Sequence, residues 1–435
     1  MSLITGPRPP FQQRISKQTD IAALPEMVVR PLSVSTQVND PLRAAPTVAV
    51  DTLAARRILQ LGMAWFPEQP GGLDRYYFEL MHALAQLRVD AVGLVAGSAA
   101  VNSSSNANVR AFAPTDASIP ARWRAVRRAV RQSLAQDPQP ALCAAHFALY
   151  AFPILRLIRS IPLVVHFHGP WAAESRVEGD GIAISAAKGL LERIVYHRAG
   201  LCIVLSKAFG KILTESYGIA DARIRVVPGG VNIKKFLIKT SKDELRRKLG
   251  WPTDRPIVLC VRRLARRMGL ENLISAVAEV RRNIPDVLAL VIGQGKLECE
   301  LRQRVKDSGL EENIRLLGVA ADKDLPSMYR AADLSIVPTQ SLEGFGLTTV
   351  ESLAAGTPVL VTPVGGLPEA VQDLSPNLIL QDSSVASLSS GLSDALNGRI
   401  SLPSTDRCQA FAAERYDWSN IAQRVMDIYR EAMQC

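Results

Sequence analysis

Residues 256–295, PIVLCVRRLARRMGLENLISAVAEVRRNIPDVLALVIGQG, contain a complete strand–helix–strand pattern. The apolar run PIVLCVRR predicts a strand, LENLISAVAEVRRNI has the apolar spacing of a helix, and LALVIGQG predicts a second strand. Strands that are apolar along their whole length are typical of parallel sheets buried on both faces. This stretch therefore predicts a parallel sheet with helices packed against it.

The same alternation continues on both sides of that stretch. Toward the C-terminus IRLLGV, LSIVPT and TPVLVT predict strands, with LECELRQRVKDSG and LPSMYRAA as helices. Toward the N-terminus RRILQLGMAW, AVGLVAG, IPLVVHFHG and GLCIVLS predict strands, with LDRYYFELMHALAQL and AAKGLLERIVYHRA as helices. The two series meet near VVPGGVNIKKF, residues 226–236. We expect an α/β protein with two doubly wound domains facing each other across a cleft, over residues 51–230 and 231–415.

The composition limits the classes of protein that fit. The polar, proline-broken residues 1–50 predict a disordered extension, with a short ordered arm as the alternative. The six cysteines are solitary, with no CxxC pair, which indicates neither a zinc site nor a disulfide framework. The most apolar long window, ALCAAHFALYAFPIL, is too short for a membrane-spanning helix, and the N-terminus lacks a signal-peptide pattern. These features favour a cytoplasmic protein.

Glycines follow two of the predicted strands, where ligands of such sheets bind. Gly71 and Gly72 follow the first strand and open the next helix, whose free backbone amides could hold an anion. A plain tight turn explains these two glycines equally well. Gly293 ends a strand in VIGQGK, which is not a full GxGxxG and therefore disfavours a dinucleotide site.

The segment SLEGFGLTTVE, residues 341–351, places two glutamates on either side of a glycine-rich helix start. The free amides of Gly346, Leu347 and Thr348 would point at a phosphate. Carboxylates are poor neighbours for phosphate but good acceptors for vicinal hydroxyls, so Glu343 and Glu351 suit sugars that flank a diphosphate. The alternative is a helix with an acidic first turn, which the helix dipole favours.

The loop VRRLARRMG, residues 261–269, carries four arginines at the end of a strand: Arg262, Arg263, Arg266 and Arg267. Four guanidinium groups repel one another unless an anion or water separates them. A solvated basic turn is the alternative. Together with the glutamate pair, the arginine loop favours a nucleotide-diphosphate sugar as the ligand.

These motifs, with GTPVLVTPVGGLPEAV and FHGPW, resemble the retaining GT-B glycosyltransferases of family 4, the glycosyl transferases of group 1, over roughly residues 55–430. The resemblance implies that the two doubly wound domains are Rossmann-like, with an acceptor site in the first and a sugar-nucleotide donor site in the second. It also implies that the last helix, in residues 416–435, packs back toward the first domain.

The resemblance assigns roles to single residues. Glu343 would bind donor-sugar hydroxyls, Glu351 the ribose hydroxyls and Arg263 the diphosphate. The rest of the donor site would be the backbone of Gly344, Phe345, Gly346, Leu347 and Thr348, together with Gly293, and Gly71 and Gly72 would shape the floor of the active site. The family has a lysine where this chain has Met268, and we transfer the role of that lysine to Arg267.

His168, in VVHFHGPW, ends a predicted strand, and the family has a histidine there close to the reacting sugar. We expect His168 to hydrogen-bond the donor sugar. His166 lies two residues earlier on the same strand face and is more typical of a core histidine. His82 and His146 lie in apolar surroundings that look helical, and we interpret both as structural.

The expected reaction transfers a hexose from a UDP- or GDP-sugar to a carbohydrate or lipid-linked acceptor hydroxyl with retention, in polysaccharide or glycolipid synthesis. No metal or other cofactor is expected: DKD at residues 322–324 matches the metal-binding DxD of other glycosyltransferases, but it directly precedes a helix and is more typical of a helix cap. No nucleic-acid partner is expected either. An oxidoreductase or epimerase would need a fuller GxGxxG. A catalytically silent sugar-nucleotide-binding or scaffold protein is the remaining alternative, which Met268 favours and the intact glutamate pair disfavours.

Basic charge is concentrated in the first half, where residues 51–230 contain 20 Lys and Arg against 13 Asp and Glu. Residues 119–134, IPARWRAVRRAVRQSL, combine five arginines with an apolar stripe at helical spacing. The stripe consists of Ile119, Trp123, Val126, Val130 and Leu134. Such a helix fits docking on the anionic inner face of a membrane. The alternative is a surface helix whose stripe packs on the first domain.

Overall fold

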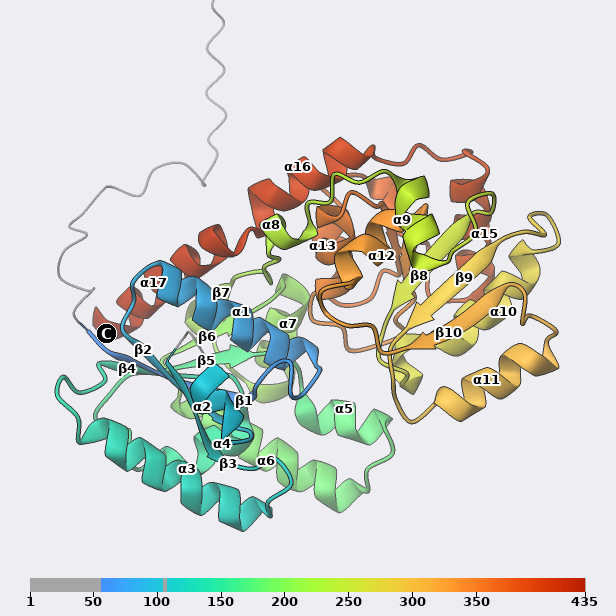
Figure 1. Cartoon of the computed structure of the whole chain (residues 1–435). Helices are drawn as coiled ribbons and strands as arrows, with labels where there is room; N and C mark the ends of the chain where they lie inside the picture. Colours follow the sequence, from blue (N-terminus) through green and yellow to red (C-terminus); the bar gives the residue numbers. More distant parts are fainter. Residues whose placement is uncertain (1–55, 105–107, 435) are drawn as a thin grey trace, which may run out of the picture. The chain divides into compact units, whose positions relative to one another are not determined.

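The computed structural model describes residues 56–104 and 108–434 of the 435-residue chain (Figure 1). The predicted extension over residues 1–50 lies outside the described residues. Two separate sheets form, and every strand pair within them is parallel. This confirms the predicted α/β fold with two doubly wound, Rossmann-like domains.

The first sheet has seven strands in the order β3-β2-β1-β4-β5-β6-β7. Its strands are β1 (Ile58–Ala64), β2 (Ala91–Ala96), β3 (Val109–Ala113), β4 (Leu142–Ala145), β5 (Leu163–Phe167), β6 (Leu201–Val204) and β7 (Ile224–Val226). Its helices are α1 (Gly72–Gln86), α2 (Ala100–Ser104), α3 (Ile119–Leu134), α4 (Ala148–Ala151), α5 (Trp171–Val177), α6 (Ile182–Arg198) and α7 (Lys207–Tyr217).

The second sheet has five strands in the order β10-β9-β8-β11-β12. Its strands are β8 (Ile257–Val261), β9 (Leu288–Ile292), β10 (Ile314–Gly318), β11 (Leu334–Val337) and β12 (Val359–Val361). The helices that follow β7 are α8 (Ile233–Phe236), α9 (Lys242–Leu249), α10 (Leu270–Val280), α11 (Glu298–Asp307), α12 (Leu325–Ala331), α13 (Leu347–Ala354), α14 (Leu367–Val371), α15 (Val385–Leu396), α16 (Thr405–Tyr416) and α17 (Trp418–Gln434).

Each sheet is covered on both faces because neighbouring strand residues point to opposite sides. In β1, Ile58 packs with residues of α1 and α17, whereas Leu59 packs with residues of α3, α4, α6 and α7. In β8, Ile257 and Val258 likewise belong to two different apolar clusters. Figure 1 shows α17 lying along α1, far from the second sheet that precedes it in sequence.

The strand orders fix where ligands can bind. In the first sheet β1 lies between β2 and β4, and in the second sheet β8 lies between β9 and β11. The chain therefore leaves each sheet in opposite directions at β1/β4 and at β8/β11, and the carboxyl ends of these strands form the crevice where doubly wound sheets bind ligands. The loops after β1, β4, β8 and β11 are the places to look for a site.

Three strands escaped the sequence prediction: β3, β4 and β7. β4 has the sequence LCAA, without a β-branched residue, and lies inside a longer apolar run. β7 has only three residues. No helix within the described residues is long and apolar enough to cross a membrane.

Helix α3 agrees with the alternative interpretation of residues 119–134, a surface helix whose apolar stripe packs on the first domain. Val126 and Val130 are fully buried, and Trp123 and Leu134 pack against the same apolar cluster of the first domain. Ile119 alone of the stripe is exposed. The interpretation of this stripe as a free lipid-facing surface is therefore wrong, because the sheet of the first domain covers most of it.

Candidate functional site

The loops after β8 and β11 bring Arg262 and Glu343 together. An Nη2 hydrogen of Arg262 is donated to Glu343 Oε2, and the same nitrogen lies 2.5 Å from Thr339 Oγ1 and 3.0 Å from the Met268 sulfur. Burial alone would raise the pKa of Glu343, but the Arg262 guanidinium, together with Arg267 and the Thr339 hydroxyl, outweighs it and the pKa is lowered. Glu343 Oε1 accepts no hydrogen bond from any residue in the described ranges, so this oxygen is left for a ligand hydroxyl.

Arg267 supports the same loop from the other side. Its Nη1 donates to the backbone oxygen of Leu342 at 2.7 Å, and Leu342 has a left-handed φ of 55° that is costly for a leucine. The guanidinium also pairs with Glu174 at 3.3 Å and Glu178 at 3.7 Å, both at α5. Arg267 therefore holds the strained turn that carries Glu343.

The other two arginines of the loop differ in their surroundings. Arg263 is exposed, and its side chain makes no hydrogen bond or ion pair with any residue that the structure describes. It lies close enough to Arg267 to help lower the pKa of that buried guanidinium, after the larger effect of burial. Arg266 is exposed and pairs with Glu300 at 3.2 Å. Among the described residues, the Arg263 side chain is thus a cation at the carboxyl end of β8 that has no hydrogen-bond or ion-pair partner.

The glycine-rich start of α13 presents unpaired polar groups. Within the described residues, the backbone amides from Gly344 to Thr348 donate no hydrogen bond. The Thr348 hydroxyl is buried without a partner. A Cβ at Gly365 would lie 1.9 Å from the backbone oxygen of Glu343, and one at Gly293 would lie 1.9 Å from the backbone oxygen of Arg262. Both glycines therefore let the loops approach closely.

Glu351 is buried and holds two partners. Its Oε1 accepts from Arg75 Nη1 at 2.7 Å, and its Oε2 accepts from the Tyr329 hydroxyl at 3.1 Å. Arg75 also pairs with Asp322, which is bonded to Lys235 as well. Asp322 is therefore an ion-pair partner rather than the helix cap that the sequence predicted, and Asp324 at the N-cap of α12 makes no capping bond with its side chain.

Gly71 and Gly72 lie at the beginning of α1, one turn before Arg75. The amide of Arg75 donates to the Gly71 oxygen at 2.9 Å, and a Cβ at Gly72 would meet nothing within 4 Å. Arg75 joins this turn to Glu351, 276 positions later in the chain. Sequence reasoning missed Arg75, and its place on the helix that follows the two glycines is the signal that could have found it.

The turn that carries His168 and the loop that carries Glu343 meet at a shared aromatic ring. A Cβ at Gly344 would lie 2.7 Å from the Phe209 ring, and one at Gly169 would lie 3.6 Å from the same ring. The turn after β5 that carries His168 and the loop after β11 that carries Glu343 therefore pack on one phenylalanine.

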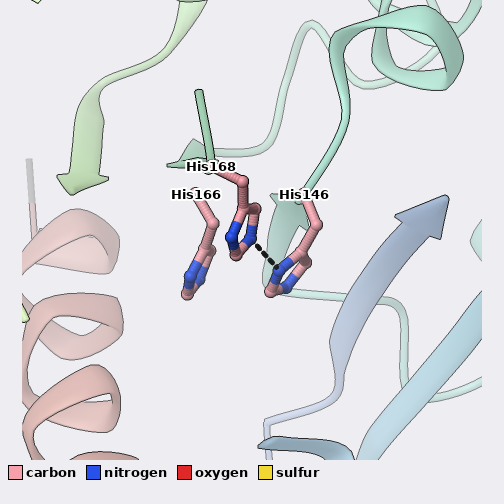
Figure 2. Close-up of side chains that lie close together, drawn as sticks. All are labelled: His146, His166 and His168. Carbon is pink, nitrogen blue, oxygen red and sulfur yellow. Dashed lines mark hydrogen bonds between the residues drawn. The ribbon is translucent and has the colours of Figure 1, made fainter. Parts of the chain in front are cut away.

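Three histidines gather at the carboxyl ends of β4 and β5 (Figure 2). His146 Nδ1 lies 3.1 Å from His168 Nε2, and the ring of His166 stacks on that of His146 at 4.1 Å. The prediction that His146 lies in helical surroundings is wrong, because His146 directly follows the unpredicted strand β4, and its interpretation as structural stays a prediction. His82 accordingly differs: it lies on α1 and packs against Trp65 and Phe78.

Two family models match this chain. Residues 241–415 match the model described as "Glycosyl transferases group 1", and residues 70–235 match "Glycosyltransferase Family 4". The D-inositol 3-phosphate glycosyltransferase of Corynebacterium aurimucosum is 29% identical over 64% of this chain and 68% of its own length. The first relatives are matched over only 54% to 68% of their own lengths.

Solved structures share the fold. The sucrose-phosphate synthase of Thermosynechococcus elongatus superposes with a TM-score of 0.73 at 21% identity, covering 86% of this chain and 98% of that one. Anabaena Alr3699/HepE in complex with UDP and glucose superposes with a TM-score of 0.70 at 22% identity, covering 86% and 100%.

Proposed function

This chain belongs to the glycosyl transferases of group 1 and has the GT-B fold, and from that premise we propose that it transfers a hexosyl group from a nucleotide-diphosphate sugar to an acceptor hydroxyl. The observation that carries the proposal is the start of α13. Within the described residues, the backbone amides from Gly344 to Thr348 donate no hydrogen bond and are free to bind an anion; Glu343, with its free carboxylate oxygen, precedes them in the chain, and Glu351 follows them. A diphosphate with a sugar at each end fits this order of groups.

Each residue has one task in this proposal. Glu343 Oε1 accepts a donor-sugar hydroxyl, Glu351 accepts a ribose hydroxyl while Arg75 and Tyr329 keep it oriented, and Arg263 neutralises the diphosphate. Fixed cations and amides that face a leaving diphosphate stabilise the charge that develops in the transition state, and such stabilisation is commonly the largest part of catalysis.

A second cation lies deeper in the site. The sequence predicts that Arg267 takes the role of the family's lysine, yet Arg267 is hydrogen-bonded to the backbone oxygen of Leu342 and ion-paired with Glu174 and Glu178. Arg262 Nη2 lies beside the Met268 side chain and Glu343. We therefore propose that Arg262 supplies the positive charge next to the donor sugar and that Arg267 holds the loop.

We propose that the sugar is transferred with retention. The acceptor hydroxyl would attack the anomeric carbon from the face that the diphosphate leaves, and its proton would pass to the departing phosphate oxygen. Neither a metal nor another cofactor takes part in this scheme. The acceptor would be a carbohydrate or a lipid-linked sugar in polysaccharide or glycolipid synthesis, bound in the basic first domain at the inner face of the membrane.

The test begins with thermal unfolding of the purified protein in the presence of UDP, GDP, ADP and their glucose or mannose conjugates. A ligand at 100 times its dissociation constant stabilises a protein by about 2.7 kcal/mol, so the right nucleotide raises the melting temperature measurably. The conjugate that binds should then be slowly hydrolysed, with EDTA present to remove divalent metals. NMR of the sugar transferred to an acceptor reports the anomeric configuration.

Three results would contradict parts of this proposal. Binding without any hydrolysis or transfer would favour the silent sugar-nucleotide-binding protein. An inverted product would exclude retention. Binding of none of the nucleotides would remove the donor site itself.

A further inference from the structure

Gln60 links the histidine cluster to helix α17. This glutamine lies on β1 and is fully buried. Its Nε2 donates to the Tyr429 hydroxyl at 3.0 Å, and its Oε1 lies 3.1 Å from His146 Nε2. A carboxamide oxygen only accepts hydrogen bonds, so the hydrogen of this contact belongs to His146 Nε2.

That hydrogen determines the other nitrogen of His146. Burial lowers the pKa of His168 to about 3 and lowers the pKa of His146 and His166 well below the ordinary value, so all three rings are neutral near pH 7. A neutral imidazole carries one hydrogen, which leaves His146 Nδ1 as an acceptor. The contact of 3.1 Å between His146 Nδ1 and His168 Nε2 then requires the hydrogen on His168 Nε2.

The hydrogen bonds from Gln60 to Tyr429 and on to His166 can be assigned donors and acceptors in the same way. The Tyr429 hydroxyl accepts from Gln60, so its one hydrogen is donated to His166 Nε2 at 2.7 Å. His166 then carries its hydrogen on Nδ1, which faces the Tyr76 hydroxyl at 3.4 Å. From His168 to Tyr76 every donor points the same way, and hydrogen bonds arranged in such a series strengthen one another.

The three histidines fit a metal site less well than they fit this series of hydrogen bonds. The histidine nitrogens lie within 4.8 Å of one another, as a metal site requires. However, the rings of His146 and His166 are stacked at 4.1 Å with only 18° between their planes. Lone pairs lie in the ring plane, and two nearly parallel planes that are stacked in this way meet only far from the rings, so His146 and His166 cannot bind one ion in these orientations. Figure 2 shows the three rings side by side rather than converging on a point.

We propose that Gln60, His146 and Tyr429 are positioning residues that hold His168 as the tautomer with hydrogen on Nε2 and a bare Nδ1. This inference rests on the proposed function and on the expectation from the sequence that His168 hydrogen-bonds the donor sugar. His168 Nδ1 accepts no hydrogen bond from any described residue and is not among the fully buried unpaired atoms. It is therefore the nitrogen open to a ligand, and in this tautomer it accepts a hydrogen bond from a sugar hydroxyl.

The tautomers are read directly by nitrogen NMR of full-length protein labelled with ¹⁵N-histidine, with signals assigned by single substitutions. We expect the hydrogen on Nε2 in His146 and His168 and on Nδ1 in His166. The reverse set, with the hydrogen on Nδ1 of His168, would overturn the proposal. This readout does not require that the protein transfers any sugar.

Two phenol deletions give a matched comparison. Tyr429 and Tyr77 are both fully buried and both hydrogen-bond Gln60, but Tyr77 reaches only its backbone oxygen, at 3.2 Å. Tyr429→Phe removes the acceptor that fixes the Gln60 amide, so His146 and His168 should show mixed tautomers. One neutral hydrogen bond contributes about 0.5–1.5 kcal/mol, so kcat should fall roughly two- to tenfold with unchanged affinity for the nucleoside diphosphate. Tyr77→Phe should leave the tautomers as in the parent.

The outcomes separate this proposal from the proposed function. Expected tautomers in a protein that turns over no sugar nucleotide would refute the transferase function and the role of His168, while the hydrogen-bond series would stand. Transfer activity with equal effects of both phenylalanine variants on the tautomers and on kcat would refute the positioning role alone.

Discussion

At the scale of single residues, substitutions of the two glutamates should affect different steps, sugar transfer for Glu343 and nucleotide binding for Glu351. In the proposed site Glu343 offers its free carboxylate oxygen to the donor sugar, so Glu343→Gln should lose most transfer while nucleoside diphosphate affinity is kept. Glu351 faces the ribose in the proposed site, so Glu351→Ala should weaken nucleotide binding itself. Calorimetric titration with the nucleotide, beside steady-state kinetics, separates the two effects. Parent-like binding and turnover in both variants would mean that the donor site lies elsewhere.

The arginines allow a second comparison between neighbours of like charge. Arg262→Ala and Arg263→Ala should each lower kcat by roughly 10²–10³, the range found when a preorganised stabilising group is removed. Arg267→Ala should lower kcat by loosening the Leu342 turn, with a smaller effect than Arg262→Ala. Arg266 is exposed and paired with Glu300, so Arg266→Ala serves as the control with near-parent kcat. A larger loss of kcat for Arg267→Ala than for Arg262→Ala would mean that Arg267, and not Arg262, takes the role of the lysine that the family has at position 268.

At the scale of secondary-structure elements, the sequence predicted what depends on local pattern. Strands β8, β9 and β11 are apolar runs that end in glycine, arginine or a polar turn, and the loops after them hold the predicted donor residues. Strand β4 was missed because LCAA carries no strand-specific residue, and His146 was misplaced with it. The contacts of Arg75 with Glu351 and of Tyr429 with His166 join residues 276 and 263 positions apart. No local pattern encodes such pairs, because they depend on how the elements pack.

The junction of β1 and α1 supports a prediction on pH. Asp74 in the first turn of α1 is buried and accepts from the amide of Ala64, the last residue of β1, at 2.9 Å. Burial raises the pKa of Asp74 to about 6 from 3.8. Between these values the folded state binds more protons than the unfolded state, so this carboxyl lowers the free energy of unfolding as the pH rises from about 4 to 7.

Asp74→Asn keeps an oxygen for the Ala64 amide and removes the titration. The free energy of unfolding of the variant should match the parent near pH 4 and exceed it by about 2–3 kcal/mol above pH 7, because one pKa unit corresponds to about 1.4 kcal/mol. Urea unfolding at the two pH values measures this, with the exposed Asp116→Asn as the control. A difference that does not change with pH would show that the buried carboxyl is not the cause.

At the scale of the whole molecule, the net charge of +10 bears on where the protein works. The apolar stripe of α3 is covered, so any attraction of this helix to a membrane must come from its arginines. Arg122 is bonded to the Tyr150 hydroxyl and Arg127 to the Pro153 oxygen, whereas the remaining arginines of the helix face solvent: Arg124, Arg128 and Arg131. These three side chains form a cationic surface that an anionic bilayer would attract.

We expect the protein to co-sediment with phosphatidylglycerol vesicles at low salt and to be released as salt rises. Each arginine near such a surface contributes about 1 kcal/mol, so replacing Arg124, Arg128 and Arg131 with glutamine should weaken partitioning roughly a hundredfold. The matched control replaces three exposed arginines of the second domain with glutamine: Arg247, Arg304 and Arg407. Both variants lose the same charge, so only a specific surface on α3 separates them. Equal partitioning of the two triple variants would show that net charge alone drives adsorption, and a soluble acceptor would then fit the enzyme better than a lipid-linked one.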